Sequence, residues 1–517
     1  MARSLGEMLR ASAAAAPQRA AVIFRGETTT YAALEVMSNT VAAFLRGQGI
    51  QKGNRVGLYC INSPAFVAAY FGIVKAGAVV VPINLLLGPE EVAFILGDAG
   101  ARGLVFYESF APLVKAIAPL LPALATRVVV GKTDEVLATP LAEIMAKPAL
   151  AYALPEIDPD VDLAAIPYTS GTTGKPKGAM LSHGNLLANA SACHQALRSR
   201  SDDVFLTVLP MFHSFACTAG VILPIFAGAT ISAMVRFMPD EVGATIEQTK
   251  ATVYLGVPSM FAVLANLPEG GAPDLSSLRM AVSGGAALPV EIMRRFEQRY
   301  RVPIHEGDGP TECGPVTTFN PTDGIRKPGT IGPPLPTVEM RVVDGEGKDL
   351  PVGEIGEIVV RGPSVMKGYW KNPEATKEAF FGDWFRTGDL GSVDADGYFS
   401  IVDRKKDMII VNGMNVYPRQ VEEVIYRHPA VAEVAVVGEP DQLHGEVPRA
   451  VIVLKEGATA TEKDILALCR EHLGRFQVPR IVEFAAQLPK NATGKILKRE
   501  IARARGERER GVSGGRA

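Results

Sequence analysis

Short runs of β-branched and aliphatic residues alternate with helical stretches through the first two thirds of the chain. RVGLYC (55–60) and AVVVPIN (78–84) have the composition of buried strands, and SPAFVAAYFGIVKAG between them has the length of a crossover helix. RGLVFY, TRVVVG, ATVYLG and LRMAVSG are further runs of this kind. Strand–helix–strand repetition favours mostly parallel sheets with helices on both faces. We therefore predict an α/β fold for this region.

The chain has 517 residues, which is more than one ordinary hydrophobic core holds. After about residue 335 the pattern changes to short strands between Gly/Asp turns, such as VEMRVVD, GEIVVRG and GYFSIVD, and these predict a β-rich subdomain. Beyond the charge run in IVDRKKDMII, helical and strand-like segments form an α+β unit. We predict a large N-terminal domain over 1–402, a small mobile C-terminal domain over 403–505 hinged at Asp403, and a disordered tail at 506–517.

The charge balance and the cysteines exclude several classes of partner. Lysine and arginine total 53 against 55 acidic residues, a net charge of −2, so nucleic acid is not expected as a partner. The five cysteines are odd in number and include no CxxC pair, which argues against a disulfide framework or a zinc site. This usage predicts a reducing compartment, the cytoplasm. The N-terminal segment, which Glu7 and Arg10 interrupt, does not resemble a secretory signal.

Residues 204–235 carry no formal charge when His213 is neutral, and the stretch is long enough to cross a membrane. Prolines and glycines divide it into pieces the size of strands and short helices: Pro210, Gly220, Pro224 and Gly228. We therefore predict buried α/β core and no transmembrane span. Peripheral contact with a membrane surface stays open at this point.

The stretch YTSGTTGKPKG (168–178) packs serine and threonine among glycines and ends in two lysines. Glycine lets backbone N–H groups turn toward an anion, the hydroxyls add donors, and the lysines add positive charge. This chemistry predicts a polyphosphate cradle. It is not a Walker A loop, because Lys175 is followed by Pro176.

The other polar motifs are ambiguous when each is taken alone. In EGDGPTECGP (306–315), Thr311 and Glu312 have the chemistry of a Mg²⁺ site completed by phosphates, but an exposed acidic turn also fits. SGGAALP (283–289) allows a flat ligand or another chain segment to approach closely. Asp389 in WFRTGDL could be a turn former, and Lys495 in PKNATGKILKRE could be a surface lysine.

Taken in order, YTSGTTGKPKGAMLSH, PMFHSF, SGGAALP, GxGPTE, WFRTGD, DRKKDMIIVNGMNVYP and PKNATGKILKRE resemble the motifs of the adenylate-forming superfamily. The resemblance runs from about residue 10 to about residue 505, and MKGYWKNPEATKEAF looks most like the fatty acyl-CoA ligases. It implies a two-step reaction. A carboxylate attacks the α-phosphate of ATP and forms acyl-AMP and pyrophosphate, and the thiol of coenzyme A then displaces AMP. ATP, Mg²⁺ and coenzyme A are the implied cofactors and substrates.

The resemblance also assigns residues to roles. Catalysis would depend on Lys495, Glu312, Thr172 and His213, and Glu312 and Thr173 would hold Mg²⁺. Lys495 would contact the α-phosphate and the substrate carboxylate during adenylation. The small domain would then rotate about Asp403 and bring in the CoA side of the site, which includes Lys405, Lys406 and Gly413. The matched nucleotide-binding residues are Thr169, Ser170, Gly171, Thr172, Thr173, Gly174, Lys177, Gly284, Gly285, Ala286, Glu306, Gly307, Asp308, Gly309, Thr311, Asp389, Arg404 and Lys495.

The acyl pocket would be formed by Phe212, His213, Phe215, Gly309 and Pro310. His213 would lie near the carboxylate end, or alternatively be a core histidine. Residues 204–235 contain no acid to pair an amino-acid ammonium group, so we favour a medium- or long-chain fatty acid. An aromatic acid of the benzoate or coumarate type is the alternative. A luciferase-like or adenylate-only enzyme and a homodimeric assembly also remain open.

One position departs from the family pattern. The family usually has tyrosine stacked on adenine where this chain has Asp308. A carboxylate cannot stack, so we predict that Asp308 faces the adenine but contributes less to its binding than a ring would.

Overall fold

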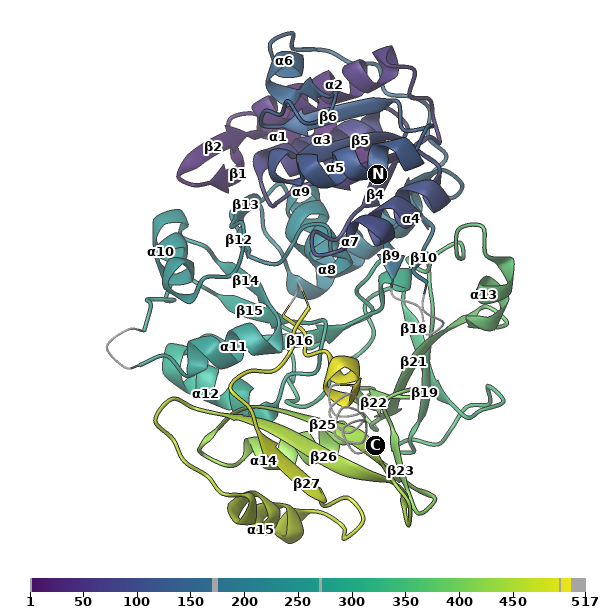
Figure 1. Ribbon diagram of the computed structural model, residues 1–517. Helices are drawn as coiled ribbons and strands as arrows, with labels where there is room; N and C mark the ends of the chain where they lie inside the picture. Colours follow the sequence, from purple (N-terminus) through teal and green to yellow (C-terminus); the bar gives the residue numbers. More distant parts are fainter. Residues whose placement is uncertain (1, 170–174, 269–271, 492–493, 504–517) are drawn as a thin grey trace, which may run out of the picture.

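The computed structural model describes residues 2–169, 175–268, 272–491 and 494–503 (Figure 1). A seven-stranded sheet near the N-terminus has the order β11-β8-β4-β3-β5-β6-β7. Its neighbouring strands are parallel, except that β11 is antiparallel to β8. The strands are β3 (Arg55–Tyr59), β4 (Val79–Pro82), β5 (Ala101–Tyr107), β6 (Thr126–Val130), β7 (Thr139–Pro140), β8 (Leu163–Ala165) and β11 (Leu181–Ser182).

An eight-stranded sheet has the order β17-β16-β15-β14-β12-β13-β1-β2, and in Figure 1 it runs from β2 in purple down to β16 in teal. Its six central strands are parallel, and β2 and β17 are antiparallel at its edges. The strands are β1 (Ala20–Phe24), β2 (Glu27–Thr30), β12 (Val204–Thr207), β13 (Thr230–Ala233), β14 (Val253–Gly256), β15 (Met280–Ser283), β16 (Ile304–Asp308) and β17 (Thr318–Phe319).

Helix α3 (Pro64–Lys75) shows why these helices form where they do. Ser63 caps its N-terminus by accepting a hydrogen bond from the N–H of Phe66, and Pro64 occupies its first turn. The helix is buried on almost all sides because it contacts α2 (Tyr31–Gly47) and strands of both sheets. Other helices of the large domain are α1 (Leu5–Ala15), α4 (Pro89–Ala99), α5 (Ala111–Ile117), α6 (Leu141–Met145), α7 (His183–Leu197), α10 (Pro239–Thr249), α11 (Pro258–Ala265), α12 (Val290–Tyr300) and α13 (Pro373–Glu378).

The uncharged stretch at 204–235 is divided into short buried elements, as its prolines and glycines predict. These are β12, α8 (Ser214–Cys217), a π-helical turn η3 (Thr218–Ile222), α9 (Leu223–Ala227) and β13. No helix in the described part of the chain combines the length and the hydropathy that crossing a bilayer requires.

An antiparallel sheet follows, as predicted for the β-rich region. It contains β18 (Glu339–Val343), β19 (Gly356–Arg361), β20 (Phe380–Phe381), β21 (Trp384–Val393) and β22 (Phe399–Arg404). Strand β22 passes through Asp403 and still pairs Arg404 with Asp389 of β21.

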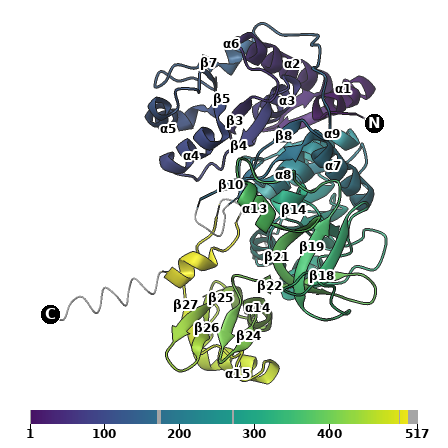
Figure 2. The ribbon, with the colours of Figure 1, turned by 90° about the vertical axis from the view of Figure 1, so that its right-hand side faces the viewer.

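The C-terminal α+β unit has a sheet of its own, ordered β24-β23-β26-β25 with β27 parallel to β26. Figure 2 shows this unit below the antiparallel sheet, while the segment that follows β27 returns toward the large domain. Its elements are β23 (Ile409–Val411), β24 (Met414–Val416), α14 (Pro418–Tyr426), β25 (Val431–Asp441), β26 (Gly445–Leu454), α15 (Glu462–His472) and β27 (Ile481–Phe484). The predicted α/β class, with parallel sheets, a β-rich part and a small α+β part, is confirmed.

Candidate active site

A cavity of about 1030 Å³ lies between the large domain on one side and α14, β25 and the segment that follows β27 on the other. Its floor follows the carboxyl ends of three parallel strands, with Val257 after β14, Gly284 after β15 and Asp308 at the end of β16. Open α/β sheets bind ligands at this edge, because loops of several strands converge there.

Most of the predicted site residues that the structure describes line this cavity. They are Thr169, Lys177, Phe212, His213, Phe215, Gly284, Gly285, Ala286, Glu306, Gly307, Asp308, Gly309, Pro310, Thr311, Glu312, Asp389, Asp403, Arg404, Lys405, Lys406 and Lys495. Gly413 is not among the lining residues and forms the turn between β23 and β24. Ser170, Gly171, Thr172, Thr173 and Gly174 lie outside the described residues.

Glu312 is held by two hydroxyl groups. Its Oε1 accepts hydrogen bonds from Thr169 Oγ1 at 3.1 Å and from Tyr369 Oη at 2.9 Å. Burial, with the charge of Glu312, raises the pKa of Tyr369, which therefore remains a donor at neutral pH. The Lys177 ammonium lies 5.3 Å from the centre of the Tyr369 ring. One carboxylate held in place by two hydroxyl groups suits a Mg²⁺ ion that takes most of its ligands from phosphates and water.

The described residues contain no group of three or more side chains that could by themselves enclose a metal ion. A site built on Glu312 would therefore take its other ligands from a bound nucleotide, from water or from Thr173, which lies outside the described residues.

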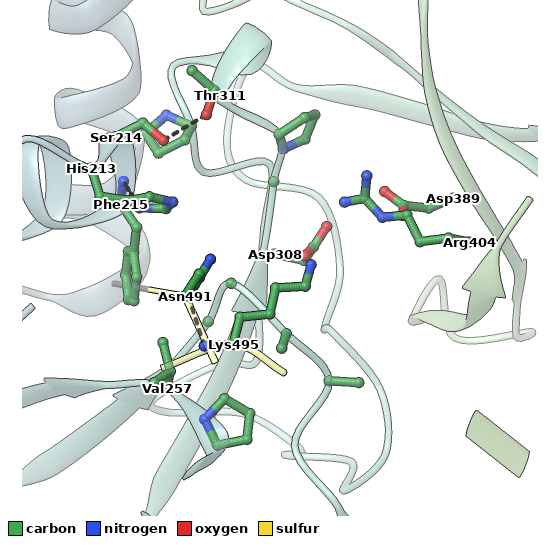
Figure 3. A pocket seen from close by; sticks show the side chains of 18 of the residues that line it. His213, Ser214, Phe215, Val257, Asp308, Thr311, Asp389, Arg404, Asn491 and Lys495 are labelled. Atoms are coloured by element: carbon green, nitrogen blue, oxygen red, sulfur yellow. Dashed lines mark hydrogen bonds and ion pairs between the residues drawn. The ribbon is translucent and has the colours of Figure 1, made fainter. Parts of the chain in front are cut away.

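Four charged side chains, Asp308, Asp389, Arg404 and Lys495, face one another across the cavity (Figure 3). Arg404 Nε lies 2.6 Å from Asp389 Oδ1, and Asp389 is almost completely shielded from water. Burial raises the pKa of Asp389 and of Asp308, while Arg404 opposes both shifts. Lys495 points toward Asp308 in Figure 3, and the attraction of the two acids opposes the lowering of its pKa by burial and by Arg404.

Glu306 adds a further buried acid to β16. Its Oε1 accepts from the N–H of Leu288 at 2.9 Å, while Oε2 has no hydrogen-bond partner in the described part of the chain. Burial raises the pKa of Glu306 to about 7, although Arg419 opposes the shift.

Short contacts attach the chain around Lys495 to the small domain. On either side of Lys495, Lys490 pairs with Glu433 at 2.5 Å and Lys498 with Glu422 at 2.7 Å. The N–H of Lys495 donates to Asn491 Oδ1 at 2.9 Å, and its carbonyl accepts from the N–H of Asn491 at 2.9 Å. Lys495 therefore projects from a tight turn into the cavity.

One wall of the cavity is apolar. Its residues come from α7, the loop after β12, and α8 to α9: Cys193, Leu197, Leu209, Phe212, Phe215, Ala219 and Leu223. His213 lies next to Phe215 of this wall (Figure 3), and its Nδ1 accepts from the N–H of Phe215 at 3.3 Å. Burial, followed by the charge of Lys495, lowers the pKa of His213 to about 4, so the imidazole is neutral at pH 7. Ser214 Oγ and Thr311 Oγ1 lie 2.8 Å apart and join α8 to the loop after β16.

The model of the AMP-binding enzyme family matches residues 9–370, and the model of its C-terminal domain matches residues 420–495. The chain belongs to the AMP-binding enzyme family.

Curated relatives of this AMP-binding enzyme act on more than one kind of acid. The long-chain-fatty-acid–CoA ligase of Bacillus subtilis (strain 168) is 36% identical over 528 residues, covering 96% of this chain and 94% of the relative. The feruloyl-CoA synthase of an Amycolatopsis species is 38% identical over 488 residues, covering 94% and 96% respectively.

Solved structures of similar proteins include an anthranilate CoA ligase in complex with anthranoyl-AMP, at a TM-score of 0.93 and 32% identity over 98% of both chains. ATP-bound MatB from Rhodopseudomonas palustris has a TM-score of 0.90 and 34% identity, covering 98% of this chain and 99% of that chain. The AMP-binding enzyme described here is therefore an acyl-CoA synthetase, an acid–CoA ligase that proceeds through an adenylate made from ATP.

The hinge predicted for this AMP-binding enzyme has its own contacts. The buried carboxylate of Asp403 accepts from the N–H of Arg404 at 2.8 Å and from the N–H of Arg419, in the first turn of α14, at 3.0 Å. Lys405 Nζ lies 3.3 Å from Glu357 Oε2. In this orientation Asp403 therefore joins the antiparallel sheet to the small domain.

Sequence reasoning missed Tyr369, which holds Glu312. Its motif, MKGYWKNPEATKEAF, was informative only as a family likeness. The only sequence signal for Tyr369 is an aromatic residue among glycine and polar residues. The neighbouring sequence does not indicate that its hydroxyl reaches Glu312.

Proposed function

We propose that this acyl-CoA synthetase activates a medium- or long-chain fatty acid. The observation that carries the proposal is the apolar wall between α7 and α9, which has no charged side chain among its lining residues. Each methylene buried against such a wall contributes about 0.8 kcal/mol to binding, so a long alkyl tail is favoured over a short one. The fatty acid–CoA ligase of Bacillus subtilis among the relatives supports the same choice.

In the proposed first step, the substrate carboxylate lies between His213 and Lys495. Carboxylate and triphosphate repel each other, so the reaction needs positive charge near the reacting atoms. Lys495 supplies this charge at the α-phosphate, and Lys177 supplies it at the pyrophosphate end. Neutral His213 can approach the carboxylate without competing with Lys495 for the nucleotide.

The remaining polar groups would hold the nucleotide. Asp389 would accept hydrogen bonds from the ribose hydroxyls, with Arg404 beside it, and Gly284, Gly285 and Ala286 would border the adenine. Glu312 would hold Mg²⁺, which offsets the charge of the phosphates when bound. The small domain would then rotate about Asp403, withdraw Lys495 and bring the turn at Gly413 toward the CoA channel.

An aromatic acid is the second candidate. The feruloyl-CoA synthase relative and the anthranilate CoA ligase structure favour it, because both proteins align with this chain over almost its whole length. Phe212 and Phe215 could pack against an aromatic ring as well as against an alkyl chain.

We also propose a cytoplasmic location for the protein. All five cysteines are free and buried, which supports a cytoplasmic, reducing environment. Neither peripheral membrane contact nor a homodimer is needed to complete the cavity from the residues described.

A panel of carboxylic acids tests the proposal. AMP release that depends on both ATP and CoA would be measured with acetate, octanoate, hexadecanoate, benzoate and a hydroxycinnamate. We expect kcat/KM to rise steeply from acetate to octanoate and to be highest for an alkyl acid. A higher kcat/KM for benzoate or the hydroxycinnamate would contradict the fatty-acid proposal and favour an aromatic substrate.

A further inference from the structure

The turn that carries Lys495 also touches the large domain. Ser259 Oγ, in the first turn of α11, donates a hydrogen bond of 2.9 Å to the carbonyl oxygen of Gly494. Gly494 directly precedes Lys495, so this contact lies next to the side chain that reaches into the cavity. The ion pairs of Lys490 and Lys498, in contrast, bind the same chain segment to the small domain.

The two surfaces fit closely at this contact. Gly494 has φ of +84°, and a Cβ atom there would lie 2.9 Å from Ser259 Oγ and 3.2 Å from Val257 Cγ2. A side chain at residue 494 would therefore displace the Ser259 hydroxyl from this contact, and the left-handed backbone conformation there favours glycine.

We propose that Ser259 is a positioning residue for Lys495. Its hydroxyl fixes the Gly494 carbonyl, and this fixes the direction in which Lys495 enters the cavity during acyl-adenylate formation. The inference rests on the role proposed above for Lys495. A group that stabilises developing charge must be held to within a fraction of an ångström, and a second support outside its own domain provides this.

The bond also distinguishes the two half-reactions. It joins α11 of the large domain to the small domain, so it exists only while Lys495 occupies the cavity. Ser259 therefore supports the step that uses Lys495 and gives no support to a step from which Lys495 has withdrawn.

The test compares Ser259→Ala, Ser259→Thr and Ser277→Ala in the full chain. Threonine keeps the hydroxyl. Ser277 is a matched control, because its Oγ donates a similar bond of 2.7 Å to the carbonyl of Ala251 within the large domain. Pyrophosphate release would report acyl-AMP formation, and conversion of supplied acyl-AMP with CoA would report the second step.

We expect Ser259→Ala to lower the rate of acyl-AMP formation about fivefold relative to the second step, the effect of one neutral hydrogen bond. Ser259→Thr should restore the ratio, and Ser277→Ala should leave it unchanged. An equal loss in both steps, an unchanged ratio in Ser259→Ala, or no rescue by threonine would overturn the inference. If Lys495→Ala did not reduce acyl-AMP formation selectively, the role proposed for Lys495 would fail, whereas the carboxylic acid panel tests the proposed substrate, so the failures are distinguishable.

Discussion

Two lysines, the buried Lys75 and the exposed Lys495, differ in how completely their ammonium groups are paired within the protein. Lys75, at the end of α3, is entirely excluded from water and has three partners: Glu35 Oε2 at 2.5 Å, Ser38 Oγ at 2.8 Å and Asn39 Oδ1 at 2.9 Å. Lys495 projects into an open cavity, and among the described residues no carboxylate lies within 4.0 Å of its ammonium.

The difference separates a structural charge from a charge that is available to a ligand. The ammonium of Lys75 has all three of its donor positions used inside the protein. Lys495 faces Asp308 and Asp389, which attract it without forming a close pair, so its donors stay free for phosphate and carboxylate oxygens. Burial lowers the pKa of both lysines, to about 8 for Lys75, so the pairing and not the pKa shift distinguishes them.

The largest expected effect is that of Lys495→Ala on catalysis. The rate of acyl-AMP formation should fall by a factor of about 10² to 10³, because the variant loses the charge that stabilises the reacting phosphate. Thioester formation from supplied acyl-AMP should continue, which provides an internal control on the same protein. Equal loss in both half-reactions, measured by pyrophosphate and thioester release, would contradict the role of Lys495.

Lys75→Met should affect stability and leave the ratio of the two half-reactions unchanged. The substitution leaves the partly buried Glu35 with Arg10, at 3.4 Å, as its remaining cation and deprives Ser38 and Asn39 of their donor, which together cost about 3 kcal/mol in the free energy of unfolding. Lys115→Met is the control, because Lys115 and Glu135 form an exposed pair at 2.8 Å and its loss should cost less than about 0.5 kcal/mol. Denaturant unfolding would measure the free energy of unfolding of both variants. Similar losses in Lys75→Met and Lys115→Met would show that burial of the Lys75–Glu35 pair does not matter.

Glu306 extends the comparison to a buried acid whose Oε2 has no hydrogen-bond partner among the described residues. Its pKa is raised from 4.5 to about 7, so the folded state holds a proton that the unfolded state releases between these values. The resulting stability is present below pH 4.5 and is lost as the pH rises toward 7 and above. Glu306→Gln should remove this dependence, because the amide keeps an acceptor for Leu288 and carries no charge.

Thermal unfolding at pH 5 and pH 8 would measure the effect of Glu306→Gln. The variant should gain on the order of 2 kcal/mol relative to wild type on going from pH 5 to pH 8. A constant difference between the two proteins at both pH values would contradict the raised pKa.

The smallest expected effect concerns the acid that faces Lys495. Asp308→Tyr should lower the KM for ATP about threefold to tenfold, because a ring can stack on adenine where a carboxylate cannot. Asp308→Asn separates the loss of charge from the gain of a ring and should not reproduce the decrease. If the KM for ATP were the same in Asp308→Tyr and wild type, the predicted position of Asp308 beside adenine would lose its support.

A region can be predicted from the sequence when local interactions define it, and cannot when it depends on contacts between residues far apart in the chain. The strands near residues 55–60 and 78–84 are buried on both faces, so their composition alone identifies them. The glycine-rich motifs were recognisable because close packing around a cavity requires glycine at fixed positions. Gly284, for example, lies so close to Phe215 and to the carbonyl of Gly307 that a Cβ atom would be 3.3 Å from both.

Residues that act through distant partners could not be predicted. Lys75 ends an apolar helix, where a lysine is ordinarily solvated, and its partners belong to α2, far away in the sequence. Ser259 and Tyr369 are common residue types in unremarkable positions, and only the fold brings them to Gly494 and Glu312. The substrate class depends on the shape of an apolar wall assembled from several segments, which residue types alone do not define.

The contact between Asp403 and α14 has a consequence for the domain rotation proposed above. Tyr417 provides no side-chain cap for this helix and Pro418 has no N–H, so the carboxylate of Asp403 satisfies the N–H of Arg419 from outside the helix. An orientation that separated the two would forgo a cap worth about 1 kcal/mol. Such a difference changes the ratio of two populations roughly fivefold. If the small domain rotates about Asp403 as proposed, this contact favours the orientation in which Lys495 lies in the cavity.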